Sequence, residues 1–291
     1  GGGGQNLIGP ELDDSLAAIR TQELLAARRV DGAEQYFTRA VDFGYSKTAE
    51  ETLAIWGKEA VLSDVVWVIR KFRPDVIVTR FSAEAGGGHG HHTASALLAV
   101  EAFSAAADPA RFPEQLRHVR PWQAKRIAWN SWRPREERDK LAPGSYLAVD
   151  LGEYSALLGK SYAELAAEGR SMHRSQGFGA VASRGSRLDY FEILAGDPAK
   201  TDLFEGVDLT WRRVPGSEQA AALLAQARHD YVPERPAAVL PLLLQARVGA
   251  CLEKKRLHDE EARHRRALAD MNRTLEQRVA EQVAQLENLG R

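Results

Sequence analysis

The spacing of hydrophobic and polar positions changes several times along the chain, and each change predicts an element. Apolar residues recur at helical spacing in four segments, which predicts helices at residues 10–30, 49–74, 93–107 and 154–176. Short runs rich in β-branched and aromatic residues predict strands at residues 34–41, 75–81, 124–132 and 145–151. The run DVIVTRF (75–81) is almost continuously apolar, as in a buried parallel strand.

Alternation of helices and strands predicts an α/β fold, a Rossmann-like three-layer domain with a mostly parallel sheet. In open α/β sheets the reactive loops lie at the carboxyl ends of the strands. The loop AEAGGGHGHH (83–92) follows strand 75–81 directly, so its position suits a functional site.

The pattern changes after about residue 215, which predicts a boundary there. We expect residues 1–215 to form the α/β domain. Residues 216–251 are predicted to form a helical connector of two helices, separated by the segment Pro233–Pro236. Residues 252–291 have no Gly or Pro before Gly290 and predict a long helix. Its apolar stripe favours a short coiled coil over a single solvated helix, and a coiled coil would allow a homodimer through 252–291. That stripe consists of Leu268, Met271, Leu275, Val279, Val283, Leu286 and Leu289.

Composition narrows the possible functions of the 291-residue chain. A formal net charge of -1 gives no electrostatic reason to expect nucleic acid as a partner. Cys251 is the single cysteine, so a metal would be held by His and carboxylate side chains rather than by thiolates. The sequence has no apolar stretch long enough for a membrane span, and we expect a soluble protein, with the cytoplasm favoured over other compartments.

The His-rich loop has two interpretations. His89 and His92 are spaced so that both imidazoles reach one ion if the chain turns into a helix at Thr93. A catalytic zinc also needs a third protein ligand, so a polar loop rich in His is the alternative.

Several other side chains allow a functional and a structural interpretation. His173, in the segment SMHRSQ, either takes part in a site or caps a helix. Arg20 and Glu23 lie three residues apart and could form a surface ion pair. The tryptophans Trp122, Trp129 and Trp132 could stack on a sugar or pack in the core.

Five of these segments together resemble the PIG-L/LmbE family of zinc-dependent N-deacetylases. The family has a first strand ending in A-H-P-D-D-E, a Gly-rich turn, an R-x-x-E helix, a P-D-V strand leading to H-x-D-H, and a later H-x-S-Q. The matching segments here are GGGGQNLIG, Arg20 to Glu23, RPDVIVTRF, HGHH and HRSQ. They stand in the family's order over residues 1 to about 215.

The resemblance implies an activity and roles for individual residues. The activity would be removal of an acetyl group from an N-acetylglucosamine-type amide of a small sugar or glycoconjugate. His92 would be a zinc ligand, His89 would be catalytic, stabilising the oxyanion or moving a proton, and Arg20 would contact the substrate. Zinc would be the cofactor.

The chain departs from the family pattern in two ways. No A-H-P-D-D-E segment precedes the Gly-rich turn, so we expect an N-terminally truncated deacetylase domain that lacks two zinc ligands and the Asp base. We expect such a chain to be inactive, and either to fold poorly or to expose a hydrophobic slot where the missing strand would lie. His91 also stands where the family has the Asp of H-x-D-H, which alters the surroundings of the metal.

Two other functions are open at this point. The tail from Leu268 is similar to helical linkers that precede output domains in bacterial signalling proteins, such as class III adenylate cyclases. A non-catalytic α/β module with a dimerising tail is therefore the alternative function. A nucleotide-binding protein is disfavoured, because neither glycine-rich segment has G-x-G-x-x-G or a P-loop lysine.

Overall fold

The computed structural model describes most of the chain up to residue 252. It describes residues 2–252 except 85–87, 143, 180 and 215, together with scattered positions between 255 and 273. The chain divides into two compact units, Gly1–Val207 and Asp208–Arg291, and each is described by itself.

The N-terminal third of the first unit is helical, as predicted. The predicted helix 10–30 is α1 (Asp13–Asp31), with Asp13 and Asp14 in its first turn, where the helix dipole favours acidic residues. The predicted helix 49–74 is two helices, α2 (Ala49–Trp56) and α3 (Lys58–Phe72). They are separated at Gly57, whose φ of 74° is readily adopted only by glycine.

The strand predicted at 34–41 is wrong, because this segment is irregular. Its backbone groups bond to side chains of the helices instead of to a neighbouring strand. The Arg39 N–H donates to Asp64 Oδ2 at 2.8 Å, and Trp56 Nε1–H donates to the Val41 carbonyl at 2.7 Å. Helices α2 and α3 therefore hold the segment as a loop.

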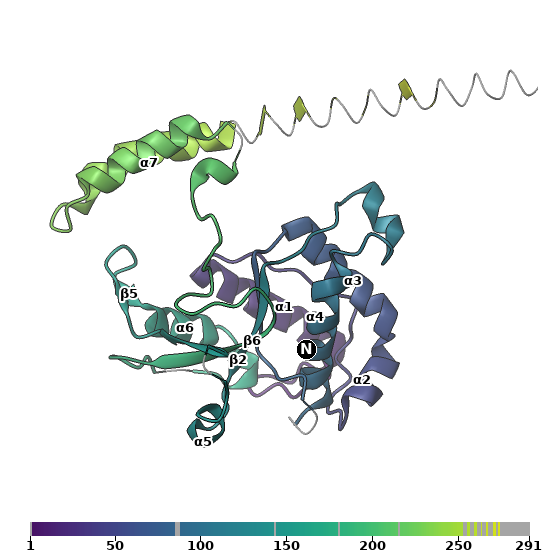
Figure 1. Cartoon of the computed structure of the whole chain (residues 1–291). Coiled ribbons are helices and arrows are strands. Elements are labelled where there is room, and N and C mark those ends of the chain that lie inside the picture. The colour runs from purple at the N-terminus through teal and green to yellow at the C-terminus, as the bar shows by residue number, and fades with distance from the viewer. Residues whose placement is uncertain are drawn as a thin grey trace, which may run out of the picture. The chain divides into compact units, whose positions relative to one another are not determined.

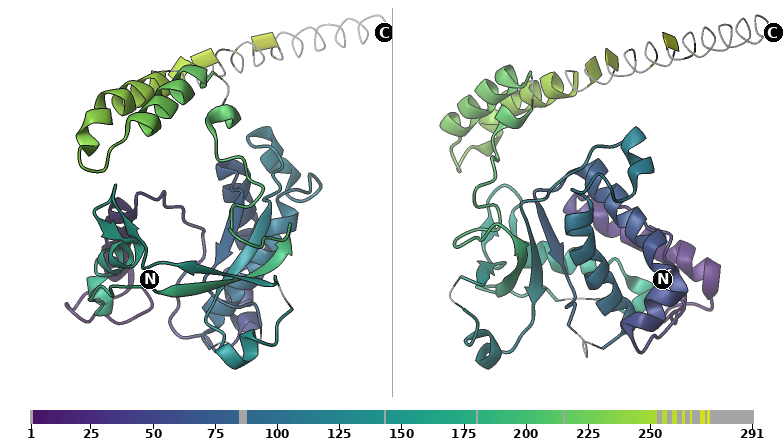
Figure 2. Two further views of the ribbon diagram at one scale, coloured as in Figure 1. Left: turned by 60° about the vertical axis from the view of Figure 1, so that its left-hand side comes forward. Right: turned by 45° about the vertical axis from the view of Figure 1, so that its right-hand side comes forward.

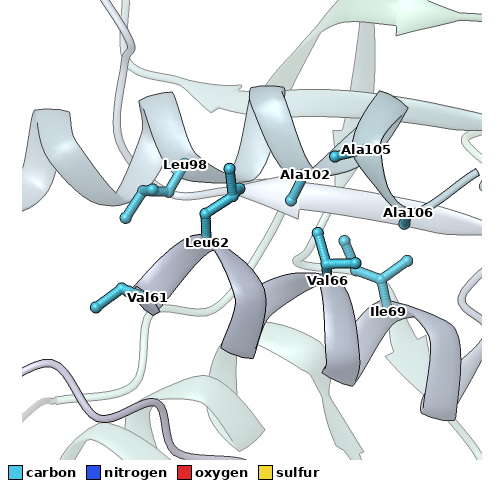
Figure 3. Close-up of a cluster of buried hydrophobic side chains, with 8 residues drawn as sticks. All are labelled: Val61, Leu62, Val66, Ile69, Leu98, Ala102, Ala105 and Ala106. Carbon is cyan, nitrogen blue, oxygen red and sulfur yellow. The ribbon is translucent and has the colours of Figure 1, made fainter. Parts of the chain in front are cut away.

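The main core lies where α3 packs on α4 (Gly90–Ala105) (Figure 3). Its buried side chains are Val61, Leu62, Val66, Ile69, Leu98, Ala102, Ala105 and Ala106. On its other side α4 covers the sheet, where Phe103 packs with Ile127. Helix α4 thus lies between α3 and the sheet (Figures 1 and 2). Small alanines at the α3–α4 contact allow the close approach that this position requires.

A four-stranded sheet in the order β1-β2-β6-β3 forms the centre of the first unit. Its strands are β1 (Val76–Thr79), β2 (Arg126–Ser131), β3 (Tyr146–Asp150) and β6 (Leu188–Gly196). Only β1 and β2 pair in parallel, and β6 runs antiparallel to both β2 and β3. The α/β class is confirmed, and the mostly parallel sheet is corrected to a mixed one. The cause is β6, a strand that the sequence analysis did not predict.

The single helix predicted at 154–176 is also corrected. The segment begins with a hairpin of β4 (Tyr154–Ser155) and β5 (Lys160–Ser161), and only Tyr162–Arg170 forms helix α6. Ser161 begins α6 with a capping box, since its hydroxyl accepts the Glu164 N–H and the Glu164 carboxylate accepts the Ser161 N–H. After α6 the chain makes a 3-10 turn at Arg174–Gln176.

Two buried arginines tie loops to this framework. Arg70 of α3 is 1% exposed, and its guanidinium donates to main-chain carbonyls at the end of α4 and in the loop that follows, and to Gln115 Oε1. Arg126 of β2 is equally buried and donates to carbonyls between Asp197 and Glu205. In both cases the planar guanidinium, with its five N–H donors, satisfies main-chain carbonyl groups at the end of a helix or in a loop.

The second unit contains helix α7 (Glu218–Asp230) and a helical stretch at 240–252, with a turn between them that includes Pro233 and Pro236. This matches the two predicted helices and their break. Among its described residues, the buried hydrophobic ones are Ala220, Ala227, Val239 and Ala246. The predicted coiled-coil stripe from Leu268 onward, apart from Met271, lies outside the described residues, and so does the homodimer contact it would make. Within the part of the chain that the structure describes, no helix is both long and apolar enough to span a membrane.

Candidate active site

The three histidines of the His-rich loop lie at the start of α4, beyond the carboxyl end of β1. Gly90, the first residue of the helix, is buried against the loop that precedes α2, and its N–H donates to the Ser46 carbonyl at 2.8 Å. A Cβ at position 90 would overlap the Thr48 carbonyl oxygen and Ser46 Oγ. Glycine is therefore required here, and the contact fixes where the helix begins.

His89 caps this helix. Its Nδ1 accepts the backbone N–H of His91 at 3.2 Å. A neutral imidazole that accepts at Nδ1 carries its proton on Nε2. The cap thus selects one tautomer and leaves His89 with an Nε2–H donor. The ring lies edge-on to Tyr45, with 5.0 Å between the ring centroids.

His91 packs among aromatic rings. Its ring stacks on Trp56 at 5.1 Å and meets Phe43 edge-on at 4.4 Å. Burial lowers the pKa of His91, and the repulsion that an imidazolium at His89 would exert lowers it further. The Nε2 atom is buried and has no hydrogen-bond partner among the described residues. His91 therefore acts as a neutral aromatic packing residue.

His92 lies face to face with Phe81, with ring centroids 3.7 Å apart and planes 2° from parallel. Its ring centroid is 5.2 Å from that of His89. Burial lowers the pKa of His92, and His89 lowers it further, so the neutral imidazole is favoured at neutral pH. Neutral imidazole is the form that binds metal ions.

The three imidazoles lie close together. His89 and His92 are near each other, as the sequence analysis predicted. The His91 ring centroid lies 4.4 Å from that of His89, but this ring packs against Trp56 and Phe43. The described residues contain no group of three or more His, Cys, Asp or Glu side chains that could hold a metal ion. A catalytic zinc takes three protein ligands and one water. The donor set described for this chain is therefore incomplete for zinc.

Arg20 and Glu23 contact the HRSQ segment instead of forming an isolated surface pair. Arg20 Nε–H donates to Ser175 Oγ at 3.3 Å, and its Nη2 donates to the Gln5 carbonyl at 2.7 Å. The Glu23 carboxylate accepts the Ser175 N–H and the Ser175 hydroxyl, each at 2.7 Å. Arg20 and Glu23 thus bind a turn about 150 residues away in sequence.

The N-terminal segment belongs to the same clamp. The Leu7 N–H donates to the Ser175 carbonyl at 2.9 Å. Three motifs of the family resemblance, the Gly-rich segment, R-x-x-E and HRSQ, therefore meet at Ser175, which is fully buried. His173 lies outside any α-helix, immediately before the 3-10 turn, so the helix end predicted for it is wrong. The contacts described for Arg20 are structural, and its contact with a substrate stays a prediction.

The sequence analysis did not predict a row of side chains that crosses the sheet. The strand register pairs Thr79 with Trp129, Trp129 with Glu192, and Glu192 with Tyr146, so the four side chains share one face. Glu192 is almost fully buried. No single segment carries a signal for this row, because the row depends on the pairing of β6 with two strands that lie far earlier in the sequence.

Arg133, just beyond β2, neutralises this buried carboxylate. Its Nε–H donates to Glu192 Oε1 at 3.0 Å, and Ser131 Oγ donates to the same oxygen at 2.6 Å. Hydrogen bonds to Glu192, and then to Glu84, raise the pKa of Arg133, so this side chain stays charged. A fixed positive charge therefore lies at the carboxyl end of β2.

Comparison with known proteins matches the first part of the chain to a family model. Residues 1–103 match the family model described as PIG-L, GlcNAc-PI de-N-acetylase. The chain thus contains a PIG-L family domain at residues 1–103, and the predicted resemblance is confirmed.

Named relatives of the chain are bacterial deacetylases and an amidase. It is 29% identical over 237 residues to a 1D-myo-inositol 2-acetamido-2-deoxy-alpha-D-glucopyranoside deacetylase of Streptomyces avermitilis, covering 68% of this chain and 79% of the relative. It is 26% identical to a mycothiol S-conjugate amidase of Streptomyces coelicolor, over 47% of this chain and 51% of that protein.

One solved structure that aligns with this chain is an N,N'-diacetylchitobiose deacetylase from Pyrococcus horikoshii, in complex with its inhibitor MPG. The TM-score is 0.41 and the sequence identity is 21%. The alignment covers 58% of this chain and 54% of that one.

Proposed function

We propose that this chain belongs to a de-N-acetylase that hydrolyses the amide of an N-acetylglucosamine-type sugar, giving acetate and a free amine. The PIG-L domain at residues 1–103 and the deacetylase relative that shares 68% of the chain support the proposal. The observation that carries it is the pair of imidazoles of His89 and His92, 5.2 Å apart at the start of α4.

In this proposal His89 stabilises the charge that develops on the substrate. When water adds to the amide carbonyl carbon, negative charge forms on the carbonyl oxygen. The helix cap leaves His89 Nε2–H as a donor, and this donor would bond to that oxygen. The proton that the attacking water loses ends on the nitrogen, and collapse of the tetrahedral intermediate then breaks the C–N bond and releases acetate and the amine.

His92 is our proposed zinc ligand, in its neutral form. The described residues supply only part of a zinc coordination shell, so we expect the chain by itself to bind zinc weakly and to be inactive on the amide. Zinc sites with an incomplete ligand set lose affinity because each protein ligand contributes to the binding free energy.

Arg20 is our proposed substrate contact. Its hydrogen bonds to Ser175 and Gln5 fix the plane of the guanidinium, so a substrate hydroxyl would meet a donor that is already positioned. A donor held in place in this way loses little conformational entropy when the substrate binds.

The test is amine release from an N-acetylglucosamine glycoside in the presence of zinc. It uses the chain as it is and an otherwise identical chain carrying A-H-P-D-D-E ahead of Gly1. We expect no release by the first and measurable release by the second. In the second chain, His89→Ala should lower kcat by about a hundredfold, the usual effect of removing one oxyanion donor.

His118→Ala is the matched control, because His118 contacts Trp67 rather than the His89–His92 pair. It should leave amine release unchanged. Absence of amine release from both chains, with zinc supplied and the fold intact by circular dichroism, would contradict the proposal.

A further inference from the structure

A continuous set of ring contacts leads from His92 to the protein surface. Phe81 lies flat on His92 and meets Trp132 edge-on, with 6.3 Å between ring centroids. Trp132 in turn packs edge-on against Trp129 at 5.6 Å. Trp132 is 51% exposed, whereas Trp129 beneath it is buried. Two ring contacts therefore separate an exposed indole from the proposed reaction centre.

Trp132 differs from the tryptophans whose role in the fold is evident. Trp56 and Trp122 use their Nε1–H groups to hold loops, donating to the Val41 and Pro74 carbonyls at 2.7 and 2.6 Å. Trp132 instead follows the last residue of β2 and presents half of its surface to solvent. Its exposed indole lies next to Phe81, which stacks on His92, so a ligand on the indole would lie close to the proposed reaction centre.

The support beneath Trp132 is rigid. The Arg133 guanidinium lies over the Trp129 ring, 5.3 Å from its centroid, and is fixed by hydrogen bonds to Glu192. An aromatic surface held by such a network loses little conformational entropy on binding.

Polar groups around the indole suit a hydroxylated ligand. The Arg80 guanidinium lies 5.7 Å from the centroid of the Trp132 ring and is oriented by Asn130 Oδ1, which accepts from Arg80 Nη1 at 2.5 Å. Below, Thr79 Oγ1 and Trp129 Nε1 are buried without a hydrogen-bond partner among the described residues, and the two residues are neighbours in the β1–β2 register. Buried donors of this kind normally bind a ligand group or a water.

We propose that Trp132 binds the second ring of the substrate, a polyhydroxylated pyranose or cyclitol attached to the N-acetylglucosamine unit. The inference rests on the proposed function. The apolar face of that ring lies on the indole, Arg80 donates to its hydroxyls, and the N-acetyl group points toward His89 and His92. Trp132 is therefore a specificity-determining residue that favours disaccharide-type substrates over N-acetylglucosamine alone.

The test is direct binding of two sugars to the full chain by isothermal titration calorimetry. The probes are N-acetylglucosamine and N,N'-diacetylchitobiose, and the variants are Trp132→Ala and Trp132→Phe. Stacking on one aromatic ring corresponds to about a fivefold change in Kd. We expect Trp132→Ala to weaken the disaccharide about fivefold and the monosaccharide less than about twofold.

Trp132→Phe keeps an aromatic face and should retain most of the disaccharide affinity, which separates loss of stacking from loss of fold. Tyr154→Ala is the control for removal of an exposed aromatic side chain elsewhere, since Tyr154 lies in the β4–β5 hairpin and is 64% exposed. It should bind both sugars as the wild type does.

The outcomes separate the two proposals. Equal losses for both sugars in Trp132→Ala, or no loss for either, would overturn the role of Trp132 while leaving the deacetylase proposal standing. Failure of the wild-type chain to bind either sugar would overturn the deacetylase proposal, and the role of Trp132 with it.

Discussion

Substitution of Glu23 by Gln tests whether the clamp around Ser175 holds the first unit together. The change preserves the shape of the side chain and removes its charge. The carboxylate accepts two hydrogen bonds from Ser175, each 2.7 Å long. The Gln amide can accept only one of them, and its NH₂ group faces the other donor.

The expected cost follows from these contacts. A hydrogen bond to a charged group contributes about 1.5–3 kcal/mol, and a buried donor left unpaired costs a similar amount. Ser175 is fully buried, so water does not replace the lost acceptor. We expect Glu23→Gln to lower the free energy of unfolding by about 2 kcal/mol, or the Tm by about 4–8 °C.

The assay is urea unfolding followed by circular dichroism, with hydrogen exchange measured at the amides of Leu7 and Ser175. Both amides should exchange faster in the variant, because Leu7 donates to the Ser175 carbonyl and Ser175 to Glu23. Glu153→Gln, an exposed position in the same unit, is the matched control and should be neutral. Unchanged stability together with unchanged exchange at Leu7 and Ser175 would refute the clamp.

Three further substitutions probe the framework around the site. In thermal unfolding, Gly90→Ala should lower the free energy of unfolding by about 2–3 kcal/mol, because the added methyl group overlaps the preceding loop. The control is Gly169→Ala in α6, which has open space around it and should be neutral or stabilising. Asp64→Asn should cost about 0.5–1 kcal/mol at pH 7. Arg39 holds the pKa of Asp64 below its usual value. The stabilisation is therefore present above about pH 4 and is lost as the pH falls through the pKa of Asp64 in the folded protein. Equal destabilisation by Asp64→Asn at pH 7 and pH 2.5 in urea titrations would contradict the ion pair. Arg126→Met should cost about 3 kcal/mol and open the loop it holds to limited proteolysis, and no new cleavage there would argue against that role.

Elements with a strong local signal were predicted well from the sequence. Segment 10–30 has a clear helical period and segment 75–81 is an almost continuous apolar run, and both are present, as α1 and β1. The predicted strand 34–41 failed because its backbone partners are the side chains of Asp64 and Trp56, which no local pattern reveals. Strand β6 was missed, and with it the mixed character of the sheet.

The candidate site likewise contains residues that a local motif predicts and residues that no local motif predicts. The cluster of His89 and His92 was visible as a motif, and the structure places both at the start of α4. The packing role of His91 was not visible, because Phe43 and Trp56 approach it from another loop and another helix. Side chains that meet only through strand register or long-range packing leave no mark on the local sequence.

The most direct test of the proposed site is the zinc affinity of the chain, measured by competition with a chromophoric chelator. The wild type is compared with His92→Ala and His91→Phe. We predict that His92→Ala weakens zinc binding about tenfold or more, a loss of at least roughly 1.4 kcal/mol. His91→Phe should leave zinc binding unchanged, because a phenyl ring keeps the packing against Trp56 and Phe43. Zinc binding that survives His92→Ala, or that is lost in His91→Phe, would contradict the proposed site.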